Sequence, residues 1–315
     1  MNHLIDKVFR AVFTDVPSHD GTVLNIPQDR IVMTTDSFVI KPLFFSGGNI
    51  GMLAVNGTVN DLAMCGARPQ YLSAAFILEE GLEMEILWRV AESMRDAAEA
   101  TGVRIITGDT KVIERGRGDG LYINTTGIGV LEHERLIAPS EVRPGDVVLL
   151  SGDVGRHGMA VMAQRENLAF HSPIVSDCAP LTAPVQALLD AGIDVRCLRD
   201  ATRGGLAAVL NEIAAAACVQ IDCIENAIPI SGAVRDACEI LGLDPLHIAN
   251  EGCFVAFIAQ EDAGAALNIL QTHNSSAAII GAVADGKGGM VTLETPIGGK
   301  RILDMPAGEL LPRIC

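Results

Sequence analysis

The chain has 315 residues, 49% of them apolar and 20% charged, which is a globular composition with enough length for two domains. Its formal net charge of −16, with no basic run to offset it, argues against binding to nucleic acid or to anionic membranes. The eight cysteines form no C-x-x-C pair or metal site, and neither a signal-peptide pattern nor an apolar run of about 18 residues is found. We therefore expect a reduced cytoplasmic protein without a membrane span.

The first 140 residues mix helical and strand patterns. The clearest helix covers Glu83–Thr101, where apolar residues recur on one face and Gly102 supplies a stop. In chain order, the other predictions are a helix over Met1–Phe13, a strand over Ile31–Thr35 that ends in the turn Asp36-Ser37, a glycine-rich loop over Phe44–Gly51, a strand over Val103–Thr107 followed by Gly108–Lys111, and a strand over Leu121–Val130.

A polar, turn-rich segment over Ala138–Asp146 predicts a domain boundary. We therefore expect an N-terminal domain over residues 1–140, a C-terminal domain over 141–304 and a mobile tail over 305–315. The C-terminal domain is predicted to hold the strands Val147–Leu150, Phe254–Ala259 and Ala277–Val283 and the helices Leu181–Ala191, Gly205–Ala217, Ala233–Leu241 and Asp262–His273. Because strands and helices mix in both domains, the fold class is α/β or α+β.

Five clusters of acidic and small residues lie near the ends of predicted elements. They are Thr35-Asp36-Ser37, Asn60-Asp61, Gly108-Asp109-Thr110-Lys111, Asp200–Gly205 and Asn250-Glu251-Gly252. Carboxylates at the ends of neighbouring strands can converge on Mg²⁺, which prefers hard oxygen ligands. For any one cluster alone, a turn or a helix cap is the simpler interpretation, since both favour the same residue types.

Two of these clusters are also candidates for binding phosphate. Gly108–Lys111 lacks the first glycine of a Walker-type loop, although Lys111 can still meet a phosphate as a point charge. Gly204 and Gly205 precede an Ala-rich helix, where they either favour an anion at the helix N-terminus or only form its entry.

Two glycine-rich segments either cradle phosphate or turn the chain. The first, Ser46–Gly51, contains Asn49 as a candidate nucleotide contact. The second, Gly152–Gly158, contains His157, which we expect to be exposed and which is a candidate catalytic base.

The last residue of the sequence is a cysteine, Cys315. Packing does not require a thiol there, and the segment Pro306–Cys315 reaches about 30 Å when extended, so the thiol can visit its own active site and that of a partner. The terminal carboxylate disfavours the thiolate, and Arg313 can partly offset that effect. A frayed tail with an incidental cysteine is the simpler alternative.

Taken together, these residues resemble the HypE family of hydrogenase maturation factors, within the PurM-like superfamily of aminoimidazole ribonucleotide (AIR) synthetases. Asp61–Pro69 fits the superfamily pattern D-x₄-G-A-x-P, and the other acidic blocks follow in family order. The ending Pro312–Cys315 is similar to the P-R-I-C ending of the family and is the most specific part of the resemblance, which covers nearly the whole chain.

The resemblance implies a two-domain PurM-like α/β fold whose N-terminal domains pair in a homodimer, with ATP in clefts around that domain. It implies that the carbamoyltransferase HypF loads Cys315 with a carbamoyl group, that ATP-dependent dehydration turns it into a thiocyanate, and that the cyano group passes to iron on the HypC–HypD complex. The implied site residues are Asp36, Asp61 and Asp109 as ligands of Mg²⁺–ATP, Thr110 and Lys111 at phosphate, Glu251 as the base near the carbamoyl nitrogen, and Asp200, Arg203 and Asn250 lining the cleft.

One departure from the family pattern bears on nucleotide binding. The family usually has a short His- and Gly-rich segment upstream of the helix that matches Met1–Phe13, and none precedes Met1 in this sequence. Either the start lies further upstream, or part of the nucleotide loop is lacking and ATP binding is weakened.

Two other functions fit part of the sequence. A synthetase or kinase of the same superfamily, acting with ATP on a free small molecule, would use the same acidic clusters and give Cys315 no role. A non-catalytic thiol carrier would present Cys315 to partners without binding a nucleotide.

Overall fold

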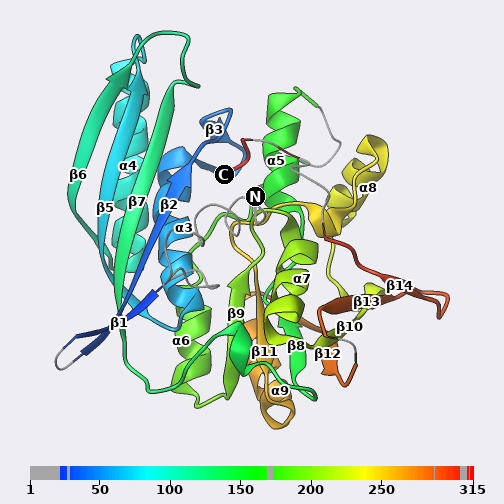
Figure 1. Cartoon of the computed structure of the whole chain (residues 1–315). Helices are drawn as coiled ribbons and strands as arrows, with labels where there is room; N and C mark the ends of the chain where they lie inside the picture. Colours follow the sequence, from blue (N-terminus) through cyan, green and yellow to red (C-terminus); the bar gives the residue numbers. More distant parts are fainter. Residues whose placement is uncertain (1–21, 27–28, 169–172, 287, 306–310, 312) are drawn as a thin grey trace.

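A computed structural model of the chain describes residues 22–26, 29–168, 173–286, 288–305, 311 and 313–315 (Figure 1). The helix predicted over Met1–Phe13 lies outside these residues. Two sheets, each flanked by helices, stand side by side, and the C-terminus lies between them, near β3 and α5 (Figure 1).

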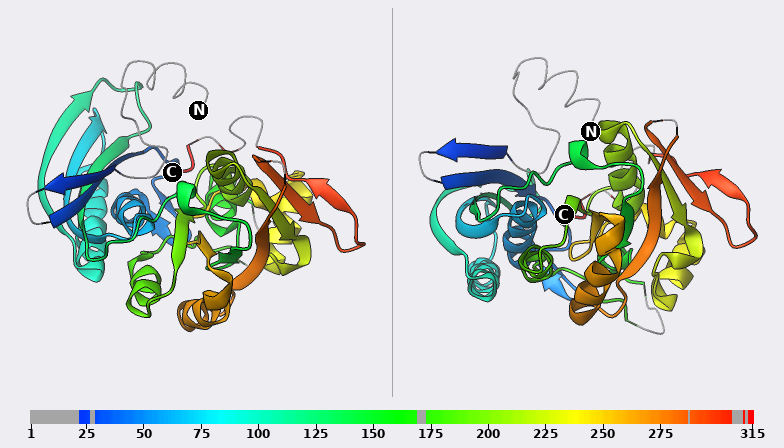
Figure 2. Two further views of the ribbon diagram at one scale, coloured as in Figure 1. Left: turned by 60° about the horizontal axis from the view of Figure 1, so that its bottom comes forward. Right: turned by 90° about the horizontal axis from the view of Figure 1, so that it is seen from below.

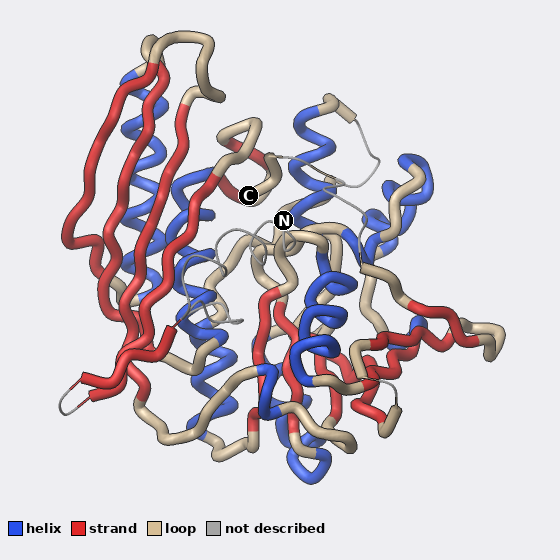
Figure 3. Tube along the Cα trace, viewed as in Figure 1, coloured by secondary structure: helices blue, strands red, loops and turns tan. Residues whose placement is uncertain are grey.

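The N-terminal sheet has five strands in the order β1-β2-β7-β5-β6. They are β1 (Thr22–Ile26), β2 (Asp29–Phe38), β5 (Arg68–Glu79), β6 (Arg104–Ile113) and β7 (Leu121–Leu131). A small hairpin of β3 (Phe44–Phe45) and β4 (Gly48–Asn49) precedes the helix α3 (Ile50–Met64), and α4 (Met84–Thr101) packs beside α3. Figure 3 shows both helices on the same face of the sheet.

Helix α3 lies at the centre of the molecule. The side chain of Asn49 caps its N-terminus by accepting hydrogen bonds from the backbone of Gly51 and Met52. A Cβ atom at Gly127 of β7 would lie 2.8 Å from Thr58 Cγ2, so a glycine there lets α3 pack directly against the sheet. The helix also contacts β9 and α6 of the C-terminal half, which explains why nearly every residue of it is buried.

The C-terminal sheet has seven strands in the order β14-β13-β10-β12-β8-β11-β9. Figure 2 shows the red strands near the end of the chain on the side of this sheet away from the N-terminal sheet. They are β8 (Val147–Leu150), β9 (Val195–Asp200), β10 (Gln220–Ile224), β11 (Phe254–Ile258), β12 (Ala278–Ala284), β13 (Met290–Glu294) and β14 (Lys300–Ile302). One apolar core joins this sheet to α7 (Gly205–Ala217), and another joins it to α6 (Thr182–Asp190) and α9 (Ala263–His273).

A third apolar core is shared between the two halves of the chain. It joins α3 and the N-terminal sheet to α5 (Arg156–Arg165) and α8 (Gly232–Leu241), and it includes Leu311 and Ile314 of the tail. The short 3₁₀ helices are η2 (Pro139–Glu141), η3 (Glu225–Ala227), η4 (Pro245–His247) and η5 (Gln260–Asp262). Among the described residues, no helix is long and apolar enough to cross a membrane.

The mixed α/β class is confirmed, and several elements match their predicted bounds to within one or two residues. Helix α4 ends at Gly102, which adopts the left-handed conformation with φ 70°, as the stop signal predicts. One prediction near the site is wrong: Asp36-Ser37 is not a turn but continues β2. Gly108–Lys111, which follows the predicted strand Val103–Thr107, continues that strand as part of β6. The neighbouring strands hydrogen-bond to both segments throughout. The domain limits stay a prediction.

Candidate active site between the two sheets

The candidate site lies where the C-terminal end of β9 and the start of β11 meet α3 and β2. Asp200 ends β9 and is 6% exposed, and Glu251, just before β11, is 4% exposed. The carboxylates of Asp200 and Asp36 both act electrostatically on Glu251, as does the guanidinium of Arg203. The structure therefore brings Asp36, Asp200, Arg203 and Glu251 together from both halves of the chain.

Glu251 has the most perturbed carboxyl group of this site. Burial raises its pKa well above the ordinary value, and the negative charges of Asp200, Asp177 and Asp36 add to the effect. Its Oε1 atom is buried and has no hydrogen-bond partner among the described residues. A carboxylate with a raised pKa is a stronger base than an exposed glutamate.

Asp177 and Cys178 also belong to this site, although no motif in the sequence points to them. Both oxygens of Asp177 accept hydrogen bonds from the backbone of Glu251, and one accepts from Gly252. A Cβ atom at Gly252 would collide with the Asp177 carbonyl, so only glycine permits this approach. Burial raises the pKa of both Asp177 and Cys178, which leaves the Cys178 thiol protonated.

Two asparagines of α3 connect the helix to this loop. Asn60 accepts a hydrogen bond from the backbone of Leu181 at 2.7 Å and donates to Ala179 O at 3.1 Å. Asn56 donates to the sulfur of Cys178 at 3.8 Å, and its Oδ1 is a second buried acceptor without a partner among the described residues. Asn56 Oδ1 and Glu251 Oε1 are thus two acceptors on opposite sides of the interface, both available to an N–H donor.

Asn250, a predicted site residue, holds three backbone segments together rather than facing a ligand. It is fully buried, accepts a hydrogen bond from Gly155 N at 2.6 Å, and donates to Ala201 O at 2.8 Å and Ile248 O at 3.1 Å. Its role in the site is therefore to fix the loops that carry Asp200 and Glu251.

Replacing Asn250 by leucine, which is close in size, removes the hydrogen bonds of its side chain to Gly155 N, Ile248 O and Ala201 O, and only Ala201 O keeps a bond, from the backbone N–H of residue 250. We expect a loss of about 2–4 kcal/mol in the free energy of unfolding, measured by urea titration. Asn226→Ala, at an exposed position, is the matched control and is expected to change stability by less than about 0.5 kcal/mol. An equally small loss for Asn250→Leu would refute this role.

Asp36 and Asp61 face one another across the seam between β2 and α3. Thr34 Oγ1 donates a hydrogen bond to Asp61 Oδ2 at 2.9 Å, and Thr34 and Asp36 alternate onto the same face of β2. A Cβ atom at Gly57, four residues before Asp61 on α3, would lie 3.9 Å from Asp36 Oδ2. These two carboxylates can serve the same ion or ligand.

Asp109 is not brought to Asp36 and Asp61 within one chain, contrary to the prediction that all three bind one Mg²⁺–ATP. Asp36 is opposite Thr125 and Gly108 is opposite Ala74, so β2 and β6 are three strand spacings, or roughly 14 Å, apart. Side chains alternate between the two faces of a strand. Because Gly108 is in register with Asp36, the next residue, Asp109, is on the face away from α3. Its carboxylate forms an exposed ion pair with Lys111 at 3.1 Å, and hydrogen bonding from Lys111 lowers its pKa.

The remaining predicted nucleotide contacts lie at the margin of the site. Asn49 caps α3 and donates to Ser93 Oγ at 2.7 Å, so its side chain is already engaged. Thr110 lies on the exposed strand β6 beside Asp109. The N-terminus of α7 is closed by η4, because a Cβ atom at Gly205 would lie 2.6 Å from the carbonyl oxygens of Leu246 and Ile248.

His157 is buried, so the prediction of an exposed histidine is wrong. It lies in the first turn of α5, with Nδ1 2.8 Å from Ser176 Oγ and Nε2 2.7 Å from the carbonyl oxygen of Ile314. A carbonyl only accepts, so Nε2 carries the proton and Nδ1 accepts from Ser176. Burial lowers the pKa of His157 to about 4, which keeps the ring neutral.

The end of the tail is bound between the two sheets. Ile314 pairs with Ile40 in an antiparallel bridge, and Val39 N donates to Cys315 O at 3.1 Å. Cys315 is partly exposed and packs against the core that also contains Cys178. His157 and Ser176 thus link the end of the tail to the segment that carries Asp177. The mobility predicted for residues 305–315 stays a prediction.

The donors at the seam fit Mg²⁺ only together with a ligand such as phosphate. No three Asp, Glu, His or Cys side chains among the described residues are grouped closely enough to hold a metal alone. Mg²⁺ commonly takes one or two carboxylates and completes its shell with phosphate oxygens and water. Asp36 and Asp61 provide such a pair.

Comparison with known proteins shows the family of the chain. Residues 18–131 match the N-terminal domain and residues 143–294 the C-terminal domain of the AIR synthase related protein family. A carbamoyl dehydratase HypE of Azotobacter vinelandii is 48% identical over 100% of this chain and 94% of its own, and that of Escherichia coli K12 is 46% identical over 100% and 96%.

Solved structures give the same result. A HypE in a complex with HypF has a TM-score of 0.91 at 46% identity over 96% of this chain and 99% of its own, and a HypE in complex with ATP has 0.89 at 45% over 100% and 96%. A thiamine monophosphate kinase of Aquifex aeolicus, 18% identical with a TM-score of 0.71 over 95% of this chain and 97% of its own, shares the fold alone. The chain belongs to the HypE family of carbamoyl dehydratases, hydrogenase maturation proteins with the fold of the AIR synthase related proteins.

Proposed function

We propose that the protein uses ATP to dehydrate a carbamoyl group carried on Cys315, giving a thiocyanate that supplies the cyano ligand of a hydrogenase iron. The observation that carries the proposal is the seating of the terminal cysteine against the apolar core that contains Cys178, because Cys178 lies in the electrostatic reach of the buried Glu251. The ATP complex of a relative supports the nucleotide, and the HypF complex of another supports the carbamoyl donor.

The reaction has two steps. In the first, the carbamoyl oxygen attacks the γ-phosphorus of ATP, ADP leaves, and the amide nitrogen loses one proton. In the second, the C–O bond breaks, the nitrogen loses its other proton, and the products are S–C≡N and inorganic phosphate. Phosphorylation is needed because an amide oxygen is a poor leaving group, and the protein contributes mainly positioning and charge stabilisation.

Glu251 is the proposed acceptor of a proton from the carbamoyl nitrogen. Its unpartnered Oε1 and the Oδ1 atom of Asn56 offer two acceptors to the two N–H bonds of the amide. The neighbouring side chains of Asn56, Asp177, Cys178 and Asp200 are buried, which would help to keep water from hydrolysing the phosphorylated intermediate. Asp200 and Arg203 line the same interface, and Arg203 offsets part of the negative charge around Glu251.

Asp36 and Asp61 are the proposed protein ligands of Mg²⁺, which would neutralise the phosphates of ATP. Asp109, Thr110 and Lys111 would contact phosphate at a site that a second copy of the chain completes, because they lie on an exposed edge strand. Every residue of β6 except the last is exposed, and the exposed fractions of Ile106 and Val112 are 60% and 67%. An unpaired apolar edge strand is a natural surface for pairing, which supports a homodimer.

The homodimer is tested by replacing Ile106 with glutamate. We expect the wild-type protein to sediment as a dimer and Ile106→Glu to shift toward monomer, because a charge opposes burial of the edge strand. Ile297→Glu, at a residue 95% exposed on the far sheet, is the matched control and should sediment as wild type. A wild-type monomer, or an unchanged dimer for Ile106→Glu, would contradict this interface.

The proposed reaction is tested by mass spectrometry of the C-terminal peptide after incubation with HypF, carbamoyl phosphate and ATP. The expected result is a carbamoyl adduct on Cys315 that then loses one water in an ATP-dependent step. A kinase or synthetase acting on a free small molecule would leave the peptide unmodified, and a non-catalytic carrier would keep the carbamoyl group.

We further propose that the cyano group passes to iron on HypC–HypD in the cytoplasm. A reducing compartment suits this chain, in which none of the eight cysteines forms a disulfide.

A further inference from the structure

A set of side chains outside the candidate chemistry holds the end of the tail. Arg165, at the end of α5, donates from Nη2 to Arg313 O at 2.6 Å and from Nε to Lys41 O at 2.9 Å, so it joins the tail to the segment after β2. His157 donates to the next tail carbonyl, that of Ile314. The tail backbone is therefore bound on two sides, by Val39–Lys41 and by α5.

The side chain of Arg313 forms an ion pair with Asp119, which lies in the connection from β6 to β7. Arg313 Nη1 lies 3.0 Å from Asp119 Oδ1, which also accepts from Lys41 Nζ at 3.1 Å. Tyr122 donates to the other oxygen of Asp119 at 3.3 Å. The Asp119 side chain is only 7% exposed, and a charged hydrogen bond in such a position is stronger than one between exposed groups.

The bound tail is also linked to the loop of the candidate base. His157 connects the Ile314 carbonyl to Ser176, and Ser176 Oγ accepts a hydrogen bond from Cys178 N at 3.1 Å. Asp177, between them, binds the backbone of Glu251. A displacement of the tail would therefore shift the segment Ser176–Cys178, which binds the backbone of Glu251.

We propose that Asp119 and Arg165 are positioning residues that recognise Arg313 and its carbonyl, seat the tail between the two sheets, and so place the Cys315 thiol for dehydration. The inference rests on the proposed function and adds a role for Arg313, which the chemistry itself does not use. Because these contacts hold the end of the tail between the two sheets, their loss would release the Cys315 thiol from this position.

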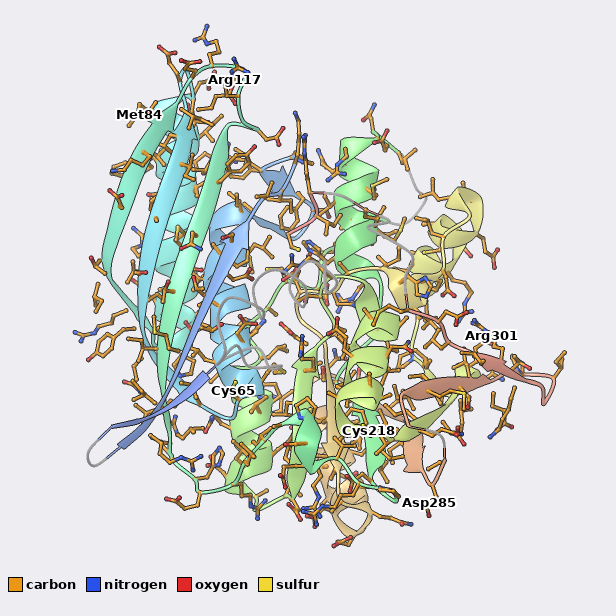
Figure 4. All side chains as sticks on the ribbon, viewed as in Figure 1. Cys65, Met84, Arg117, Cys218, Asp285 and Arg301 are labelled. Atoms are coloured by element: carbon orange, nitrogen blue, oxygen red, sulfur yellow. The ribbon has the colours of Figure 1, made fainter. Side chains whose placement is uncertain are left out.

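Alkylation of Cys315 tests the seating without any activity. Cys218 is exposed at the C-terminus of α7 and serves as an internal reference (Figure 4), so the ratio of iodoacetamide labelling at Cys315 to that at Cys218 is measured by peptide mass spectrometry. Asp119→Asn is expected to raise this ratio about tenfold, the effect of losing one charged hydrogen bond. Arg313→Gln should raise the labelling ratio equally, and a change in the tail is not expected to unfold either half of the chain. Arg313→Lys keeps the positive charge and should restore part of the protection of Cys315 from labelling.

The double variant Asp119→Asn/Arg313→Gln should be no more reactive than either single variant, since both remove the same contact. Glu225→Gln, which removes the carboxylate partner of Arg301 on the surface (Figure 4), is the matched control and should leave the ratio unchanged. An unchanged ratio in Asp119→Asn, or additive effects in the double variant, would overturn the recognition of Arg313.

The second readout is the reaction itself. With HypF, carbamoyl phosphate and ATP, Asp119→Asn should take up the carbamoyl group at least as fast as the wild type and lose water about tenfold more slowly. Raised labelling with unchanged water loss would refute the positioning role. If the wild-type protein takes up no carbamoyl group, the proposed function fails, while the labelling ratios still decide whether Asp119 seats the tail.

Discussion

Replacing Cys315 by alanine is expected to abolish both the carbamoyl adduct and the cyano product. The thiol is the only group of the tail end that can carry a carbamoyl group as a thioester-like adduct, and the other cysteines except Cys218 are buried. The measurement is mass spectrometry of the whole chain and of its C-terminal peptide after incubation with HypF, carbamoyl phosphate and ATP.

Cys218→Ser is the matched control, because it removes the other exposed cysteine without touching the tail. It should load and dehydrate as the wild type does. Equal carbamoylation of Cys315→Ala would show that the group is carried elsewhere and would exclude the carrier role of the tail.

Replacing Glu251 by glutamine should separate the two steps of the reaction. The variant is expected to accept the carbamoyl group normally, because Glu251 is proposed to act only in the dehydration, but to lose water about 100-fold more slowly or worse, the usual cost of removing a general base. The time course of the adduct and of the product, followed by mass spectrometry, gives both rates. Glu261→Gln, at an exposed position of η5, is the matched control.

The same variant has a stability signature that follows from the raised pKa of Glu251. Between the ordinary value and the raised folded value the folded state binds more protons than the unfolded state, so wild-type stability falls as pH rises through this window. Glutamine does not titrate, so the stability of Glu251→Gln relative to wild type should increase from acid to neutral pH. Normal dehydration by Glu251→Gln, or a pH-independent stability difference, would remove Glu251 from its proposed role.

The sequence predicts the elements with a clear surface pattern and misses those without one. Helix α4 shows one buried face and a glycine stop, so its bounds follow from periodicity. Helix α3 is buried on nearly all sides between the two halves, so it has no apolar stripe to detect, and its polar residues Asn56 and Asn60 resemble a turn. Helix α3, which joins the two halves of the chain, therefore cannot be recognised from an apolar pattern in the sequence.

The candidate site is predictable in part for the same reason. Asp36, Asp200 and Glu251 stand out as acidic residues beside small ones, and the structure brings them together. Asp177 and Cys178 lie in a segment without regular structure, so only their contacts with Glu251 and Asn56 identify them. Asp109 and Lys111 have the composition of a loop, but sheet pairing extends β6 through them, and this pairing cannot be read from local sequence.

The most direct test of the account follows the carbamoyl oxygen. HypF is supplied with carbamoyl phosphate whose carbonyl carries heavy oxygen, ATP is added, and the inorganic phosphate and the C-terminal peptide are analysed by mass spectrometry. If ATP phosphorylates the carbamoyl oxygen on Cys315, the heavy oxygen appears in the inorganic phosphate as the peptide gains its cyano group. Formation of the cyano peptide with the heavy oxygen released as water, and none in phosphate, would contradict the mechanism.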